Sequence, residues 1–167
     1  VFANNAAISS SLADISITGI GRGSSGSNAT GISLSNTSVS AGTSLNLVGS
    51  TTLANSLGVS ASSGSTLTAG SNLTLTTNSV SLTGSTVNTT AGTISVNATG
   101  DLTVAGDIVT GALAADTTLT LKATNNIVLN NSVTLDATSN ANTHKLNVVL
   151  WADSDNSGAG SITMSAG

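Results

Sequence analysis

The residues best suited to chemistry stand near the carboxyl end of the chain, in the segment ADSDNSGAGSIT. Asp153, Asp155 and Ser157 alternate along this segment, and Gly158 follows them. Calcium loops use this spacing, because alternate oxygen ligands converge on a hard cation and glycine permits the sharp turn. The twelfth position of such a loop requires an acid, and it is Met164 here, so the segment is not an EF-hand.

Two interpretations of this segment stay open. Asp153, Asp155 and Ser157 could ligate calcium, or the segment could be a solvated corner, since Asp and Asn are also ordinary turn residues. No cofactor other than calcium is expected. Thermal melting of the parent protein and of an Asp153→Ala/Asp155→Ala double variant, each with and without calcium, tests the site. Identical melting curves of the parent with and without calcium would dismiss it.

The other residues that could take part in catalysis are isolated. His144 is the only histidine, and no motif supplies the nucleophile that a catalytic triad needs. The seven acids are scattered, and Trp151 is the lone large ring, which fits badly with a β-helical enzyme that degrades polysaccharides. We therefore expect no enzymatic activity, with His144 exposed in a loop. Alternation with Leu150 places Trp151 on the outer face, against a neighbouring loop or, as an alternative, stacked on a sugar.

The composition excludes several classes of protein. Charged residues are 6% of the chain, against about 25% in an ordinary domain. Ser, Thr, Asn, Val and Gly form poor helices, while the mean hydropathy of +0.32 is too high for a disordered chain. The net charge of −4, with three basic residues, argues against nucleic acid or an anionic membrane as partner. No apolar run reaches the roughly 18 residues of a membrane span, and the absence of cysteine excludes disulfides.

Aliphatic residues recur in pairs two apart, which is typical of short half-buried strands. These pairs form three series with a nearly constant step, as expected of an internal repeat. The three series are Ile32, Leu53, Leu73, Ile94 and Leu119; Val39, Val59, Val80, Leu102, Ile127 and Val148; and Leu45, Leu67, Val87, Ile108 and Val133. The longest step of each series falls in the same repeat, and one insertion around Val109–Thr118 explains it.

Three short strands in each repeat of about 20–25 residues predict an all-β fold, a parallel β-helix or β-solenoid. Each strand would lie about 4.8 Å from its counterpart in the next coil, with inward aliphatic side chains stacked in columns. Seven to eight such coils fit in 167 residues. We predict one β-helical segment over residues 1–167, with residues 150–161 as a protruding loop.

The repeats GSNLTLTTNSVSLTGSTVNTTAGTISVNATGDLTVAG and LTLKATNNIVLNNSVTLDAT resemble the shaft repeats of the filamentous haemagglutinin family. The resemblance extends over roughly Ile15 to Gly167. The family comprises large exoproteins and adhesins of Gram-negative bacteria, commonly exported by two-partner secretion. It implies a right-handed parallel β-helix, export across the outer membrane, and a role as a secreted or cell-surface stalk. The Asn-Pro motifs of the family's secretion domain are not represented, because the chain has no proline.

The sequence thus predicts a mechanical function, as a shaft segment of a longer adhesin or exoprotein. The alternative is a subunit of a self-assembling extracellular β-solenoid filament. The expected partners are flanking coils of the same protein or stacked copies of it, because neither end shows a capping helix. A host or cell-surface receptor would contact loops such as Thr18–Gly31 or Ala152–Ser161.

Overall fold

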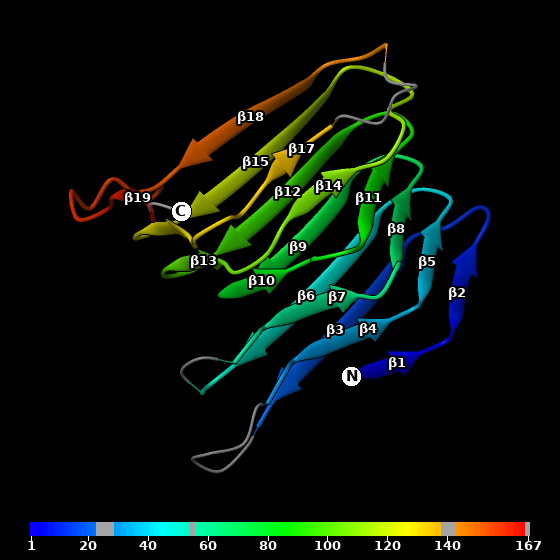
Figure 1. The fold of residues 1–167 in the computed structure, drawn as a ribbon, viewed down its shortest axis with the longest axis horizontal. Coiled ribbons are helices and arrows are strands. Elements are labelled where there is room, and N and C mark those ends of the chain that lie inside the picture. Colours follow the sequence, from blue (N-terminus) through cyan, green and yellow to red (C-terminus); the bar gives the residue numbers. More distant parts are fainter. Residues whose placement is uncertain (23–28, 54–55, 138–142, 166–167) are drawn as a thin grey trace.

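The computed structural model describes residues 1–22, 29–53, 56–137 and 143–165, which form three parallel β-sheets and no helix (Figure 1). Sheet A stacks β1 (Phe2–Asn4), β4 (Ile32–Ser35), β7 (Val59–Ser62), β10 (Ser79–Ser81), β13 (Leu102–Val104), β16 (Ile127–Leu129) and β19 (Ile162–Met164). Sheet B stacks β2 (Ala7–Ser10), β5 (Ser38–Ala41), β8 (Thr66–Ala69), β11 (Thr86–Thr89), β14 (Ile108–Thr110) and β17 (Leu135–Asp136). Sheet C stacks β3 (Ile15–Gly21), β6 (Leu45–Thr51), β9 (Leu73–Thr77), β12 (Thr93–Ala98), β15 (Thr117–Ala123) and β18 (Leu146–Trp151).

The chain visits the three sheets in the order A, B, C and then returns to A one coil further along. Each strand from β1 to β16 pairs in parallel with the strand three places later in the sequence, as in β3, β6 and β9. This winding confirms the predicted parallel β-solenoid with three strands per coil. In Figure 1 the coils are stacked in sequence order, from the blue amino-terminal coil to the red carboxyl-terminal coil. The right-handed winding stays a prediction of the resemblance.

The predicted number of seven to eight coils is wrong, because the described solenoid has about five turns. In sheet C, the successive paired residues are Ile15, Leu45, Leu73, Ile94, Leu119 and Val148. Only the steps from Leu73 to Ile94 and from Ile94 to Leu119 keep the predicted length of a repeat. The steps toward both ends of the chain are longer, so fewer coils fit.

The predicted series are correct in part of the middle of the chain and wrong toward its ends, and Val80 and Val87 pair with Val104 and Thr110 rather than with Leu102 and Ile108. Leu73 stacks on Ile94, Val59 on Val80 and Leu67 on Val87, as expected. However, Leu45 lies in sheet C and Val39 in sheet B, so each belongs to a different column from the one predicted.

The corners between sheets C and A explain these errors. Residues 22–31 and 52–58 join those sheets in the first two coils, whereas Asn78 alone joins β9 to β10. A long corner lengthens the repeat, so a series with a constant step passes to the wrong strand. The insertion predicted around Val109–Thr118 is confirmed, since residues 111–116 separate β14 from β15 while residues 90–92 join the strands below them.

Inward apolar residues, which alternate with outward polar residues along each strand, form the core. In β15 every second residue is buried, and Leu119 and Leu121 are completely enclosed between coils. The same pattern in the other central strands unites the inward side chains in one aliphatic cluster. Outward positions carry mainly Thr, Ser and Asn, which are half-buried by their neighbours in adjacent coils.

Two glycines permit a close approach of the chain at the corner between sheets C and A. Gly49 is an inward residue of β6, and a Cβ atom placed there would collide with the carbonyl oxygen of Gly58. A Cβ atom at Gly58 would in turn meet the Oγ1 atom of Thr77 in the next coil. Small residues therefore allow the chain to turn sharply against the neighbouring coil.

Candidate functional site

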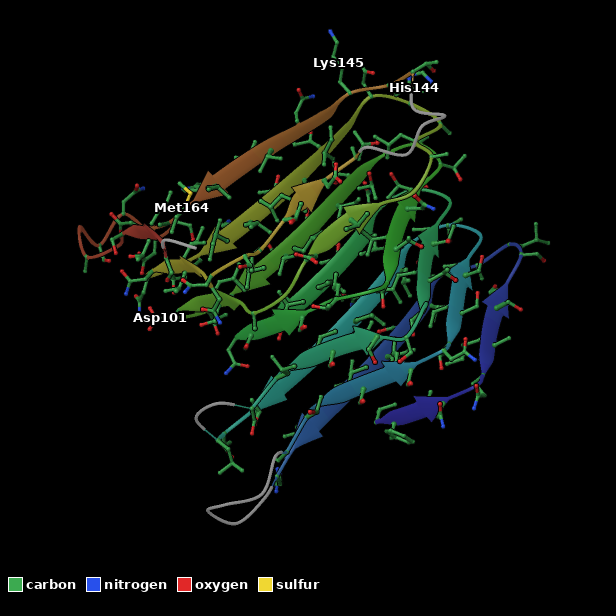
Figure 2. The ribbon with its side chains drawn as sticks, viewed as in Figure 1. Asp101, His144, Lys145 and Met164 are labelled. Atoms are coloured by element: carbon green, nitrogen blue, oxygen red, sulfur yellow. The ribbon has the colours of Figure 1, made fainter. Side chains whose placement is uncertain are left out.

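Asp and Asn side chains that immediately precede strands connect each coil to the next. Asp101 stands before β13, and its Oδ1 accepts hydrogen bonds from the backbone N–H of Asn126 at 3.1 Å and from its Nδ2 at 2.9 Å. Asn126 stands before β16, and its Oδ1 accepts from the backbone N–H of Ser161 at 3.0 Å and from its hydroxyl at 2.8 Å. Three successive coils are joined in this way. Asp101 is labelled at this corner in Figure 2.

The same contact recurs at the other corners; we call these acceptor residues the corner acceptors. Each one accepts the backbone N–H of the residue at the equivalent corner of the next coil. The pairs and their distances are Asp14 with Ser44 (2.8 Å), Asn72 with Thr93 (3.1 Å), Asp107 with Thr134 (2.8 Å) and Asp116 with Lys145 (2.9 Å). Each corner acceptor thereby gives a backbone N–H at the corner a side-chain partner in the adjacent coil.

Hydrogen bonding lowers the pKa of three of the carboxyl groups. The Thr43 hydroxyl, followed by the Ser44 N–H, holds the pKa of Asp14 below its ordinary value. The Lys145 N–H is the main cause of the lowered pKa of Asp116. Both carboxylates are thus favoured in the charged form that accepts the hydrogen bonds between coils.

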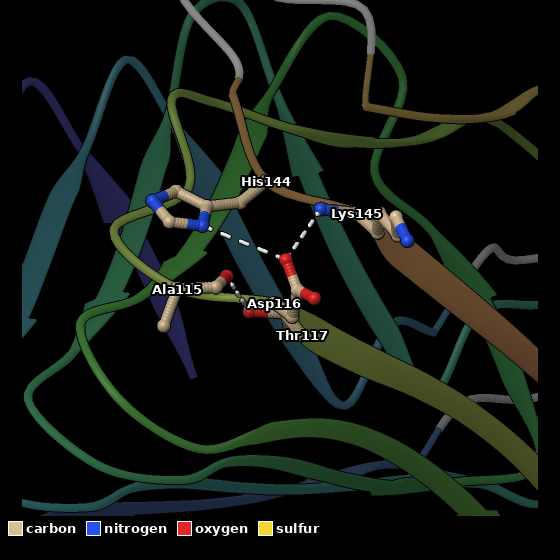
Figure 3. A network of polar contacts seen from close by, with 5 residues as sticks. All are labelled: Ala115, Asp116, Thr117, His144 and Lys145. Atoms are coloured by element: carbon tan, nitrogen blue, oxygen red, sulfur yellow. Dashed lines mark hydrogen bonds and ion pairs between the residues drawn. The ribbon is translucent and has the colours of Figure 1, made fainter.

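Figure 3 shows His144 beside Asp116, where the insertion of residues 111–116 meets the last described coil. The Nδ1 atom of His144 lies 3.5 Å from Oδ1 of Asp116, and both side chains are exposed. The neighbouring hydroxyl, on Thr117, donates to the carbonyl oxygen of Ala115 at 3.1 Å. His144 is exposed as predicted, and its side chain contacts that of Asp116.

The segment proposed for calcium folds around one of its own carboxylates. Asp153 accepts from the Ser157 hydroxyl at 3.0 Å and from the Gly158 N–H at 3.1 Å, while Asp155 accepts from the Ser157 N–H at 3.3 Å. The Ser157 hydroxyl is the main cause of the lowered pKa of Asp153. Among the described residues, no group of three or more acidic, histidine or cysteine side chains could hold a metal. Asp153, Asp155 and Ser157 are brought together as a hydrogen-bonded turn, and calcium binding there stays a prediction.

Trp151 extends outward at the end of β18, as its alternation with Leu150 predicted. The Nζ atom of Lys122 lies 4.4 Å from the centre of its ring. Because Lys122 and Trp151 are register partners on β15 and β18, this cation–π contact connects adjacent coils. Nothing in the sequence pattern indicated the contact, since the two residues are far apart in the chain.

The first and last described coils leave inward-facing apolar side chains accessible. Val148 stacks on the fully buried Leu119 and is itself 43% exposed. Met164, labelled in Figure 2, stacks on Leu129 and is 69% exposed. In the first coil Ile15 is only half-buried, although its stacking partner Leu45 is fully enclosed. The apolar columns of the core therefore reach both end faces of the described solenoid.

No protein family matches the chain, and neither a curated protein nor a solved structure is significantly similar to it. Within the described residues, no helix is long and apolar enough to cross a membrane.

Proposed function

We propose that this chain is a structural shaft segment of a secreted or surface-exposed adhesin or exoprotein. The observation that carries the proposal is the continuous stack of three parallel sheets, in which corner acceptors connect one coil to the next. Each coil buries its aliphatic residues against its neighbours, so stability grows with the number of coils. A rod of this kind separates what lies at its two ends by a fixed distance.

The proposal extends to the filamentous haemagglutinin type of exoprotein, exported by two-partner secretion to the outer surface of a Gram-negative bacterium. The resemblance of the repeats to the shaft repeats of that family supports this extension. The low content of charged residues and the lack of cysteine support it as well. The outward Ser, Thr and Asn side chains support a structural role over an enzymatic one.

An antibody against these residues, applied to intact cells of the source organism, tests the proposal. We expect labelling of the cell surface or recovery in the medium, and labelled rods in electron micrographs. A cytoplasmic marker protein that stays unlabelled is the control for cell integrity. Labelling confined to lysed cells would contradict the proposal.

The second candidate is a subunit of an extracellular filament that assembles end to end. The accessible inward residues at the two ends, such as Ile15 and Met164, support it, because a stacked copy would cover them. A flanking coil of the same protein would cover these residues equally well. The two candidates differ in the length of the native polypeptide.

A further inference from the structure

The three sheets do not end at the same height at the carboxyl-terminal end of the described solenoid. Sheet A contains seven strands, whereas sheets B and C contain six each. The additional strand of sheet A is β19, which follows β17 and β18 in the chain and pairs with β16. No described strand pairs with the outer edges of β17, β18 and β19, which we call the carboxyl-terminal edges. They rise in this order by one coil in all, so a step one strand high separates β19 from β17.

The middle one of these edges, that of β18, is suited to pairing with another chain. Figure 1 shows β18 as the outermost strand of sheet C. It extends over Leu146–Trp151, and all of its residues except Asn147 are apolar. Proteins commonly protect a sheet edge with charged residues or proline, and β18 contains neither. A long apolar edge of this kind is a template for a further strand.

The exposed apolar side chains of the protein gather at its ends. Among the described residues, every large apolar side chain that is exposed lies in the first or the last coil. Those of the last coil are Val148, Val149, Trp151, Ile162 and Met164. All five belong to β18 or β19, two of the three strands that form the carboxyl-terminal edges. Pairing at these edges would therefore bury apolar surface together with unpaired backbone groups.

The step between β19 and β17 determines which arrangement of two copies fits. A copy stacked head to tail begins with β1 of sheet A. If its β1 lay on β19, one strand would be missing above β17 and above β18. If its β2 lay on β17 instead, its β1 would occupy the place of β19. Head-to-tail stacking therefore leaves a gap or a collision at this end.

A two-fold axis through β18, perpendicular to the rod, gives an arrangement without a gap. A rotation preserves the hand of the winding, so the stepped end of one copy fits the stepped end of the other. The rotation exchanges sheets A and B and leaves sheet C in place. β18 then pairs antiparallel with β18 of the partner subunit, and β19 pairs with β17 of the partner subunit. An interface of this kind is isologous and closes at two copies.

The alternation of β18 selects the register of the central pair. Its inward residues are Leu146, Val148 and Leu150, which stack on β15. When the axis passes through Val148, this residue lies opposite Val148 of the partner subunit, and Leu146 lies opposite Leu150 of the partner subunit. Every inward residue of the strand then faces an inward residue, which continues the apolar core from one copy into the other.

The charges beside β18 agree with this register. Lys145 directly precedes the strand, and Asp153 follows it two residues after Trp151. In the antiparallel pair, Lys145 lies opposite Trp151 of the partner subunit and near the segment that carries Asp153 of the partner subunit. Opposite charges are thus brought together twice, at the two ends of the central strand pair. A parallel alignment of two β18 strands would place like charges beside each other.

We propose that the carboxyl-terminal edges bind a second copy of this chain, in a closed antiparallel pair with β18 against β18 at its centre. The proposal goes beyond the shaft function. In a longer shaft, the next coil of the same polypeptide would occupy these edges. Pairing is measured on the folded chain of 167 residues, whereas the shaft function is measured on native cells, so the two proposals can fail separately.

Sedimentation velocity of the folded chain tests the closed pair. Concentrations from about 1 to 200 µM cover dissociation constants in the micromolar range. We expect a single larger species with twice the chain mass of 16.0 kDa, and no further growth as the concentration rises. A monomer at all of these concentrations would overturn the proposal. A series of ever larger species would overturn it as well, because it would show open stacking.

Charges at Val148 test the two-fold axis. Val148→Lys places two ammonium groups opposite each other, and Val148→Glu places two carboxylates there, so each variant alone should dimerise at least about tenfold more weakly. An equimolar mixture of the two should regain the dimer, because opposite charges then meet. Leu12→Lys, at an exposed apolar residue of the first coil, is the matched control and should dimerise like the parent. Full dimerisation of Val148→Lys alone would contradict this surface.

A cysteine at the same position tests the register independently of affinity. Opposite residues of antiparallel strands have Cα atoms about 4.5–5.5 Å apart, which a disulfide accepts. Val148→Cys should therefore form a covalent dimer on mild oxidation, in a chain that has no other cysteine. Leu12→Cys should stay monomeric on a non-reducing gel. Circular dichroism confirms that each variant is folded, and equal cross-linking of the two cysteine variants would overturn the proposed pairing.

Discussion

At the residue scale, the corner acceptors explain a feature of the composition. All seven acids are Asp and none is Glu. In four of them, Asp14, Asp101, Asp107 and Asp116, a carboxylate oxygen reaches the backbone of the adjacent coil. The short side chain suits a spacing of about 4.8 Å between coils and loses little conformational entropy when it is fixed there.

Removing a corner acceptor should destabilise the solenoid. Asp107→Ala leaves the N–H of Thr134 without its side-chain partner. By comparison with helix-capping residues, the expected loss is about 0.5–2 kcal/mol in the free energy of unfolding. Asp107→Asn keeps an oxygen acceptor and is the matched control. Urea denaturation measures both variants, and equal destabilisation by Ala and Asn would show that the hydrogen bond is not the cause.

Acid should weaken the same contacts. Because hydrogen bonds from Thr43 and Ser44 lower the pKa of folded Asp14, its carboxylate stabilises the protein fully above the unfolded pKa of about 3.9. That stabilisation is lost as the pH falls through the lower folded pKa. We expect the urea midpoint to be level between about pH 7 and 5 and to decline below about pH 4. The decline should be shallower in Asp14→Asn, and an identical pH profile would exclude a contribution from this carboxyl group.

Asp and Asn are ordinary turn residues, so their general suitability for corners follows from the sequence, whereas their partners do not. Each hydrogen-bond partner is a full coil away, as Thr134 is from Asp107. Its identity depends on the register between coils, which local chemistry does not determine. The contact of Lys122 with Trp151 was hidden for the same reason.

At the element scale, strand type was predictable and register was only partly so. Alternation correctly identified strands such as β9 and β12, because inward and outward residues differ sharply in polarity. Many strands, such as β13, however, have two inward residues that are two apart. A shift of the register between neighbouring strands by two residues leaves the pattern of burial unchanged. Val80 accordingly pairs with Val104, whereas Leu102 was expected. Long corners added the larger errors in the first two coils.

An engineered disulfide tests the observed register. Thr74 and Ser95 are paired on the outer face of sheet C. Parallel neighbours about 4.8 Å apart fall within the Cα separation that a disulfide accepts. Thr74→Cys/Ser95→Cys should therefore oxidise readily in a chain that has no other cysteine. Thr74→Cys/Thr120→Cys, which spans two coils, should stay reduced, and the reverse result would contradict the register.

The inward columns should dominate stability. Leu75 is completely buried between Leu47 and Val96, so Leu75→Ala should cost about 2–5 kcal/mol in the free energy of unfolding. Leu12 is 89% exposed, and Leu12→Ala should change that free energy by less than about 0.5 kcal/mol. Chemical denaturation compares the two, and equal effects would contradict the described core.

At the scale of the whole molecule, the structure is a stack whose core reaches both end faces. Val148 and Met164 lie at one face, and Ile8 and Ile15 lie at the other. Apolar columns of this kind are continued most simply by further coils. The shaft proposal places those coils in the same polypeptide, and the filament alternative places them in other copies.

The most direct measurement is the mass, under denaturing conditions, of the native polypeptide that an antibody against these residues recognises. As a segment of a longer shaft, the chain should occur within a polypeptide far heavier than 16.0 kDa. Peptide sequencing should then find residues that continue the chain at both ends. A native mass near 16.0 kDa would contradict the shaft account, and end-to-end assembly of a small subunit would take its place.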